Sequence, residues 1–198
     1  MNTRKILIIA TKNKGKIKEI KEILCDIPIE IRSLNEIGLD IDVEETGKTF
    51  AENAILKAKA IGERTGLLTL AEDSGLEVDA LGGRPGVFSA RYVSGSDIDR
   101  INKLLKKLKN VPREKRKARF RAVVAIYDPN TKSVQTFEGM SEGYITEKPM
   151  GTNGFGYDPI FFNLDLGKTN GEATFEEKNR VSHRARALEK CKKLLASL

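Results

Sequence analysis

The sequence predicts an α/β fold, and three stretches carry that prediction. Lys5 to Ala10, KILIIA, is a continuous apolar run typical of a central strand covered on both faces. A polar loop and an amphipathic helix follow it, as in a βα unit. Further along, Arg119 to Tyr127 and Ser133 to Gly139, joined by DPNTK, read as a β-hairpin that EGYIT extends.

Length and composition indicate a globular protein that is either one large domain or two closely packed lobes. We predict a single domain over residues 1–198. The chain is 39% hydrophobic and 32% charged, which excludes a disordered class. Apolar runs are too short to span a membrane. The first residues have five consecutive apolar positions and no cleavage pattern of small residues, so we expect no signal peptide and a cytoplasmic location.

Cysteine and histidine usage narrows the chemistry. Cys25 and Cys191 have no CxxC partner, so zinc fingers are excluded and we expect two reduced thiols. A single histidine, His183, excludes HExxH proteases and His-rich metal sites. The net charge of +7 favours an anionic partner, either nucleic acid or a phosphorylated small molecule.

The first βα connection is a candidate phosphate site. Its helix has apolar residues at Ile17, Ile20, Ile23 and Leu24, and its N-terminus offers unpaired NH groups and the positive end of the helix dipole. No Walker A pattern is present. The alternative is a lysine-rich turn before a surface helix. The candidate phosphate ligands are Thr11, Lys12, Asn13, Lys14, Gly15 and Lys16.

An acidic segment precedes the second helix, TFAENAILKAKAIGERTG. Thr49 and Glu52 predict a capping box, and the apolar stripe of this helix is assigned to the core. Glu44 lies in the loop before it. Paired with Asp73 it would suit Mg²⁺, which takes one or two carboxylates plus substrate phosphates; solvated acids are the alternative.

Ala71 to Tyr92, AEDSGLEVDALGGRPGVFSARY, is the candidate active-site loop. We expect a short strand over Leu67 to Ala71 that ends in Glu72 and Asp73 and delivers both acids to one rim. The following glycines and Pro85 predict tight turns near those acids. The alternative is an ordinary surface loop.

Ser96 to Asn110 predicts a capped amphipathic helix whose lysines continue into a run of ten basic residues from Lys103 to Arg121. Such a run could bind RNA, but Phe120 is its only aromatic residue. We therefore prefer a solvated basic face and expect no nucleic-acid partner.

The segment MGTNGFGYDPIFF predicts a glycine frame that presents Phe155 and Tyr157 to a flat ring, with Asp158 bonding its edge. Asp158 could equally cap a turn before Pro159. Ser182 is the expected N-cap of the last helix, which places His183 and Arg184 in its first turn.

Five motifs, ATKNKGK, EETG, AEDSGLEVDALGGRPGVFSARY, GTNGFGYDPIFF and SHRARAL, resemble in order and spacing the inosine triphosphate pyrophosphatase family, the bacterial XTP/dITP diphosphatases. The resemblance spans nearly the whole chain. It implies hydrolysis of ITP, dITP and XTP to the monophosphate and pyrophosphate with Mg²⁺, in a homodimer. It also implies an elongated, mixed α/β fold of two lobes around a substrate cleft.

Carried over by motif, the resemblance implies that Glu44 and Asp73 hold the metal and that Asp73 is the proton acceptor. The residues implied in nucleotide binding are Thr11 to Lys16, Ser74, Phe155, Gly156, Tyr157, Asp158, Lys178, His183 and Arg184. Lys12 and Glu72 depart from the family pattern, and Glu72 leaves open which acid touches the metal. A pyrophosphatase for other modified nucleotides is the nearer alternative.

Overall fold

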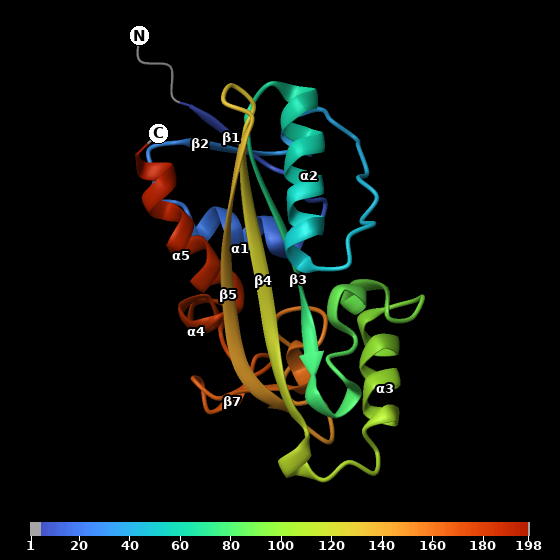
Figure 1. Ribbon diagram of the computed structural model, residues 1–198. Helices are drawn as coiled ribbons and strands as arrows, with labels where there is room; N and C mark the ends of the chain where they lie inside the picture. Colours follow the sequence, from blue (N-terminus) through green and yellow to red (C-terminus); the bar gives the residue numbers. More distant parts are fainter. Residues whose placement is uncertain (1–4, 198) are drawn as a thin grey trace. The chain divides into compact units, whose positions relative to one another are not determined.

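A computed structural model describes residues 5–197, which form a mixed seven-stranded sheet with helices around it (Figure 1). The strand order is β2-β1-β3-β4-β5-β6-β7. The strands are β1 (Ile6–Ile9), β2 (Glu30–Ser33), β3 (Leu68–Val78), β4 (Lys117–Asp128), β5 (Ser133–Ile145), β6 (Phe161–Asn163) and β7 (Lys168–Thr169). The α-helices are α1 (Lys14–Ile23), α2 (Phe50–Thr65), α3 (Asp97–Lys107), α4 (Phe175–Val181) and α5 (His183–Ala196). The 3₁₀ turns are η1 (Asn35–Ile37), η2 (Asp79–Leu81), η3 (Gly86–Arg91), η4 (Arg113–Lys115) and η5 (Asp158–Ile160).

The chain divides into two compact units. Unit 1 runs to Asp73 and includes Ala122–Gly139 and the residues from Arg184 onward, whereas unit 2 comprises Ser74–Arg121 and Met140–His183. Strands β3, β4 and β5 each contribute residues to both units. Each unit has a hydrophobic cluster of its own. Among the described residues, no helix is long and apolar enough to cross a bilayer.

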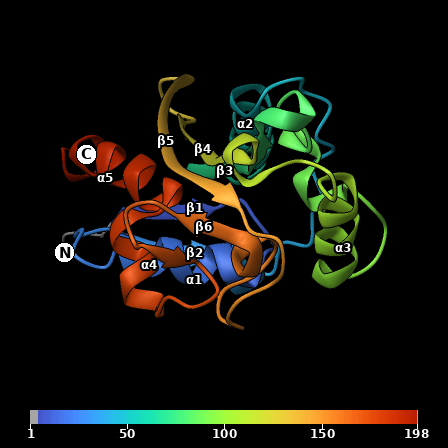
Figure 2. The same cartoon turned by 90° about the horizontal axis from the view of Figure 1, so that it is seen from below.

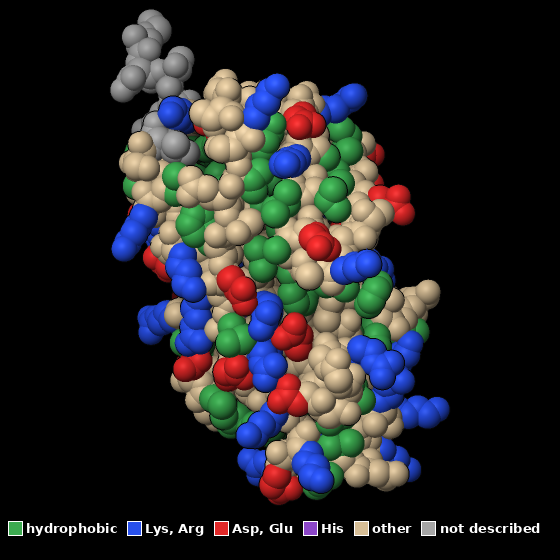
Figure 3. Space-filling view, viewed as in Figure 1, with side chains coloured by type: hydrophobic (Ala, Val, Ile, Leu, Met, Phe, Trp, Pro, Cys, Tyr) green, Lys and Arg blue, Asp and Glu red, His purple; other side chains and the backbone are tan. Residues whose placement is uncertain are grey.

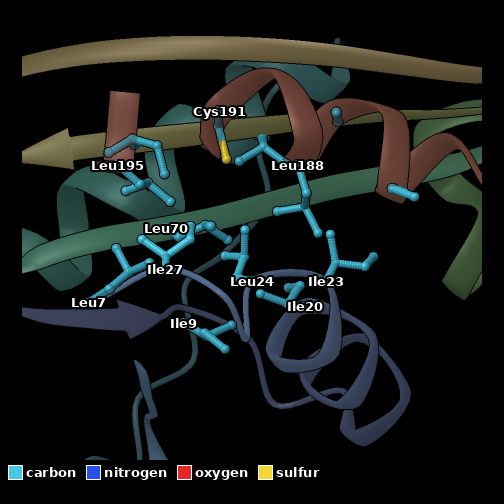
Figure 4. Close-up of a cluster of buried hydrophobic side chains, with 14 of the residues drawn as sticks. Leu7, Ile9, Ile20, Ile23, Leu24, Ile27, Leu70, Leu188, Cys191 and Leu195 are labelled. Carbon is cyan, nitrogen blue, oxygen red and sulfur yellow. The ribbon is translucent and has the colours of Figure 1, made fainter. Parts of the chain in front are cut away.

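Unit 1 is a sheet with helices on both faces. Strand β1 pairs in parallel with β2 and β3, as its continuous apolar sequence predicts. Alternate residues of β1, β3 and β4, such as Leu7 and Leu70, pack against α1 and α5, and Figure 4 shows this cluster. The opposite face meets α2, where a Cβ on Gly62 would lie 2.3 Å from the Tyr127 ring.

Unit 2 packs α3 and the β5–β6 region around a second cluster that includes Leu76, Leu104 and Phe161. Strand β5 pairs antiparallel with β6, with Tyr144 opposite Phe162, and Figure 2 shows the two strands. The predicted hairpin is confirmed and is longer than expected, because β4 and β5 run to 12 and 13 residues. The predicted capping box of α2, Thr49–Glu52, and the predicted N-cap of α3 are also confirmed, and Ser96 forms a capping box with Asp99.

The prediction of an active-site loop over Ala71 to Tyr92 is wrong for its first residues, which belong to a strand. Strand β3 does not end at the acids but continues for 11 residues through Glu72, Asp73 and Gly75 to Val78. The chain stays extended because its residues are buried on both sides, and β3 lies between β1 and β4 in the sheet. The turns begin only after Val78, where Gly82, Gly83 and Gly86 adopt positive φ angles.

Candidate functional site

Strand β3 separates the two neighbouring acids. Because successive side chains of a strand point to opposite faces, Asp73 lies on the face that meets α2, and Glu72 lies on the face that meets α1 and α5. Both are buried, at 5% and 1% exposure. The expectation that both acids reach one rim is therefore wrong, and the two carboxylates have different surroundings.

Asp73 is held by two residues of α2. Asn53 Nδ2 donates to Asp73 Oδ2 at 3.1 Å, and Lys57 Nζ lies 3.5 Å from Asp73 Oδ1. Lys57 also bonds Glu45 Oε1 at 2.5 Å. Burial raises the pKa of Asp73 above its ordinary value, against the opposing effect of the Lys57 charge. A raised pKa favours proton acceptance near neutrality, which suits a general base.

Glu72 is bound by cations. The Arg184 guanidinium donates through Nε to Oε2 at 2.7 Å and through Nη2 to Oε1 at 3.0 Å, and a third bond from Nη1 reaches Glu19. Lys16 Nζ lies 3.7 Å from Glu72 Oε1. Burial tends to lower the pKa of Arg184, but its pairs with Glu72 and Glu19 outweigh burial and raise it. The negative charge of Glu72 is thus balanced by cationic side chains of the protein.

Arg184 is buried and ion-paired. It lies in the first turn of α5 as predicted, but it is 1% exposed and belongs to unit 1, where its guanidinium binds two carboxylates. A bidentate pair with Glu72 fixes the orientation of the guanidinium plane. Ion pairing with Glu72 and Glu19 accounts for the burial of Arg184, and its predicted contact with a purine oxygen stays a prediction.

The connection between β1 and α1, the candidate phosphate site, has the strand–loop–helix form that the sequence predicts. Strand β1 ends at Ile9 and α1 begins at Lys14, with Asn13 as N-cap accepting from Lys16 N at 3.1 Å. The first turn contains no acidic residue, so the positive end of the helix dipole is not offset there. Thr11 Oγ1 accepts from Asn13 N, and the exposed Lys12 pairs with Asp40 at 2.7 Å.

Lys16 is the most enclosed lysine of this loop. Only 15% of its side chain is exposed, and burial lowers its pKa despite the attraction of Glu72. The nitrogen lies beside Glu72 and within electrostatic range of Asp73. The loop and the two acids therefore belong to one charged region of unit 1.

The acids fit a divalent cation that also binds substrate. Glu44 is exposed and directly precedes Glu45, which the structure links to Asp73 through Lys57. Among the described residues, no group of three Asp, Glu, His or Cys side chains could hold a metal alone. One or two carboxylates completed by phosphate oxygens and water is the usual arrangement for Mg²⁺. Asp73 and Glu45, joined by Lys57, are carboxylates of that kind.

In unit 2, Asp158 and Lys178 form a buried pair. Lys178 Nζ lies 2.6 Å from Asp158 Oδ2, which also accepts from Phe155 N at 2.9 Å. Asn170 Nδ2 donates to the other oxygen. Asp158 therefore caps the turn before Pro159, the alternative raised from the sequence. Lys178 Nζ also lies 4.6 Å from the centre of the half-buried Phe155 ring.

Tyr157 does not present its ring for stacking. It is 4% exposed, belongs to the unit 2 core, and donates its hydroxyl to Ser89 O at 3.0 Å. Burial raises the pKa of Tyr157. Packing against Leu76 and Phe161 explains the burial, so the expected pair of stacking rings reduces to Phe155. Gly156 N donates to Asp97 Oδ2 at 2.7 Å, which joins this segment to α3.

His183 is stacked against Phe120. The two ring centroids are 4.8 Å apart and the planes differ by 12°, so Phe120 sets the plane of the imidazole. His183 is 5% exposed and begins α5 as predicted. Ser74, half-buried in β3, directly follows Asp73 and is the first residue of unit 2.

A family model, described as the Ham1 family, matches residues 7–194. The chain belongs to the Ham1 family. The dITP/XTP pyrophosphatase of Bacillus subtilis (strain 168) is 51% identical to it over 190 residues, which cover 95% of this chain and 96% of that protein. The protein of the same name from Symbiobacterium thermophilum is 50% identical over 199 residues, covering 99% and 98%.

Solved structures agree with this membership. A HAM1 protein from Coxiella burnetii matches with a TM-score of 0.88 and 40% identity, covering 98% of this chain and all of that one. The Ham1 protein of Staphylococcus aureus matches with a TM-score of 0.86 and 42% identity, covering 98% and 99%. The family resemblance and the mixed α/β class predicted from the sequence are confirmed.

In this member of the Ham1 family, sequence reasoning did not predict four residues that contact Asp73, Arg184 or His183. They are Asn53, Lys57, Glu19 and Phe120. Asn53 and Lys57 could have been found, because both lie on the side of α2 that carries the apolar stripe, where a polar group needs a buried partner. Glu19 is a charged residue directly before Ile20 of the buried α1 stripe. Phe120 had no comparable signal, since its partner lies 63 residues away in the sequence (183 − 120).

Proposed function

We propose that this chain hydrolyses deaminated purine nucleoside triphosphates, ITP, dITP and XTP, to the nucleoside monophosphate and pyrophosphate. The observation that carries the proposal is about 50% identity over nearly the whole length to proteins named dITP/XTP pyrophosphatase. The chain is accordingly a hydrolase that acts on nucleoside triphosphates. The buried acid and lysines of unit 1 support the same chemistry.

The residues of unit 1 are proposed to act on the triphosphate. Lys14, Lys16 and the NH groups at the start of α1 would bind phosphate oxygens, because such a substrate carries about four negative charges. Asp73 would accept the proton of the attacking water, and burial raises its pKa toward that task. Mg²⁺, held by Asp73 and Glu44, would supply charge neutralisation on the phosphates when bound.

The residues of unit 2 are proposed to select the base. His183 in its fixed plane would donate to the six-keto oxygen, and adenine would present an amino group there and leave the donor unpaired. Phe155 would stack on the ring, and Lys178 lies against that ring. Asp158 would act chiefly by holding Lys178. Ser74, Gly156 and Tyr157 complete the proposed nucleotide contacts, with Tyr157 as structural support.

The deciding experiment measures pyrophosphate release from ITP, XTP, ATP, GTP and dUTP, with Mg²⁺ or with EDTA. We expect release from ITP and XTP that needs the metal, and a loss on the order of 10³-fold in kcat for Asp73→Asn. Glu72→Gln is the variant for comparison with Asp73→Asn, because the Glu72 carboxylate is bound by Arg184 and is not proposed to accept the proton. Equal turnover of all five nucleotides would contradict the proposed base selectivity.

His183 carries a separate prediction. His183→Ala is expected to narrow the preference for ITP over ATP in kcat/KM by at least about tenfold, because a buried donor no longer discriminates the two bases. His183→Asn keeps a donor and should retain part of the preference. An unchanged ratio in His183→Ala would remove His183 from base recognition.

Nucleic-acid binding by the Lys103 to Arg121 run is the weaker alternative. Arg116 is buried and donates to three backbone carbonyls. Arg119 pairs with Asp79 and Glu142, and Arg121 pairs with Glu77. Figure 3 shows Lys and Arg side chains interspersed with Asp and Glu over the lower strands of the sheet. Such intermixing favours a solvated surface over a polyanion site. The homodimer and the cytoplasmic location stay predictions.

A further inference from the structure

A chain of buried amide side chains ends at the Asp158 carboxylate in unit 2. Asn163, the last residue of β6, and Asn170, which follows β7, are both buried. Asn163 Nδ2 donates to Asn170 Oδ1 at 3.1 Å, and Asn170 Nδ2 donates to Asp158 Oδ1 at 3.1 Å. Burying two carboxamides is costly unless their polar atoms are bonded, so their partners show what the burial achieves.

Hydrogen-bond chemistry allows one orientation of the two amides. A carboxylate only accepts hydrogen bonds, so Asn170 must present its NH₂ group to Asp158 and its oxygen to Asn163. The NH₂ group of Asn163 then bonds Asn170 and Ser141 Oγ, the latter at 3.1 Å. Its oxygen accepts from Asp165 N at 3.0 Å. The chain of bonds therefore has a single direction, and it ends on Asp158.

The other oxygen of Asp158 bonds two residues of the proposed base site. Asp158 Oδ2 accepts from Lys178 Nζ at 2.6 Å and from Phe155 N at 2.9 Å. An aspartate carboxylate turns easily about its terminal bond, so the bond from Asn170 to Oδ1 restricts where Oδ2 can lie. Lys178 Nζ lies 4.6 Å from the centre of the Phe155 ring. The placement of both groups therefore depends on the carboxylate plane.

The backbone around Asp158 leaves the carboxylate little room. Gly154 has a φ of 78°, and a Cβ on it would lie 2.1 Å from Asp158 Oδ2. On the other side, Gly171 N donates to Asp158 O at 2.9 Å, and a Cβ on Gly171 would lie 2.8 Å from Pro159 Cα. Because Gly171 directly follows Asn170, the amide and the loop that it bonds are held together by side chain and backbone.

We propose that Asn170, supported by Asn163, is a positioning residue for base recognition that orients the Asp158 carboxylate. Through that carboxylate it sets the places of Lys178 and Phe155 against the purine. This inference rests on the proposed function of the base site. Neither amide is assigned a contact with the substrate. A hydrogen bond to a charged group is a strong one, so its loss is expected to change nucleotide affinity about tenfold or more.

The first test is Asn170→Asp, which keeps the shape of the side chain and replaces the donor that faces Asp158 with an acceptor. Calorimetry should show that inosine monophosphate binds about tenfold or more weakly. KM for ITP should rise in parallel, with kcat within about threefold of the wild type, because the residues proposed to act on the triphosphate lie in unit 1. Wild-type affinity, or a fall in kcat at unchanged KM, would overturn the role of Asn170.

The matched control is Ser141→Ala, at the far end of the same chain of bonds. It leaves one hydrogen of Asn163 unbonded and should lower stability, but it leaves the bond from Asn170 to Asp158 in place. We expect its affinity for inosine monophosphate to stay within about twofold of the wild type. If Ser141→Ala weakened binding as much as Asn170→Asp, lost stability alone would explain the effect and the positioning role would be wrong. Asn170→Ala is the second variant, with a loss of affinity in the same direction, in case Asn170→Asp folds poorly.

A fluorescence measurement tests the positioning role without any nucleotide. The chain has no tryptophan, so Phe155→Trp introduces a single reporter at the ring that Lys178 contacts. Acrylamide should quench this tryptophan more strongly when Asn170→Asp is added, and Ser141→Ala should leave the quenching unchanged. Equal quenching in all three proteins would overturn the positioning role. A wild-type protein that neither hydrolyses ITP nor binds inosine monophosphate would contradict the proposed function, and the quenching comparison would still decide whether Asn170 positions the ring.

Discussion

Glu36 shows how a single carboxylate ties local segments together. It bonds Lys21 of α1 through both oxygens, at 2.7 and 2.8 Å, and accepts from the backbone and the hydroxyl of Ser33 in β2. The bond from Lys21, helped by those from Ser33, lowers the pKa of Glu36 to about 2. The charged form is therefore the one that stabilises the folded state.

The sign of the pH dependence follows from that shift. A carboxyl group whose pKa is lower in the folded state adds stability above its unfolded pKa, and the gain is lost as the pH falls toward the folded value. Glu36→Gln should lower the free energy of unfolding by about 0.5–1 kcal/mol at neutral pH, a modest value because the side chain is half exposed. The deficit should narrow between about pH 5 and about pH 3.

Urea unfolding across this pH range measures the effect. Glu22→Gln is the control, since Glu22 is an exposed glutamate on the same helix α1. A deficit for Glu36→Gln that stays constant down to about pH 3 would contradict the ion-pair explanation.

At the scale of elements, α2 shows how closely a helix can approach the sheet. Gly62 lies over Tyr127 of β4, where a Cβ would be 2.3 Å from Cδ1 of the ring and 3.3 Å from Thr69 Oγ1. Tyr127 is 2% exposed, so its ring has little room to move. Because α2 also carries Asn53 and Lys57, this close packing helps to set their distance from Asp73.

Gly62→Ala should therefore destabilise the protein. Alanine normally stabilises a helix interior by about 0.5–1 kcal/mol relative to glycine, but the overlap with Tyr127 should outweigh this gain and cost about 1–3 kcal/mol. Chemical denaturation gives the difference, and Tyr127→Leu in the same background should recover part of it. Higher stability of the single variant would show that the helix can shift away.

At the scale of the whole molecule, the buried acid of the proposed site is expected to lower the stability of the fold. Burial raises the pKa of Asp73, so the folded state holds that proton more readily than the unfolded chain does. The carboxyl group then favours folding at low pH, and this contribution is lost as the pH rises through the folded pKa. At neutral pH the charged, buried Asp73 is a net cost.

Asp73→Asn should raise the Tm of the metal-free protein by a few degrees at neutral pH, although it removes catalysis. The gain should shrink as the pH is lowered toward about 4. Thermal scans in EDTA measure it, and added Mg²⁺ should reverse the order, because the wild type alone keeps the Asp73 ligand. A lower Tm for Asp73→Asn in EDTA would mean that the Asn53 and Lys57 contacts outweigh burial.

The sequence by itself determined the features that local patterns encode. The apolar run of β1, the stripes of α1, α2 and α3, the capping box of α2 and the N-cap of α3 depend on residues a few positions apart, where periodicity and side-chain-to-backbone bonds act. The family motifs likewise identified the resemblance to the inosine triphosphate pyrophosphatase family, and the Ham1 family model matches nearly the whole chain.

Only the tertiary structure decided how the acids are used. The strand alternation that sends Glu72 and Asp73 to opposite faces required β3 to continue past them, which depends on strands far along the chain. Arg184 reaches Glu72 across 112 positions and Glu19 across 165. Such pairs leave no local signature, because ion pairing and burial are decided by which elements pack together and not by spacing along the sequence.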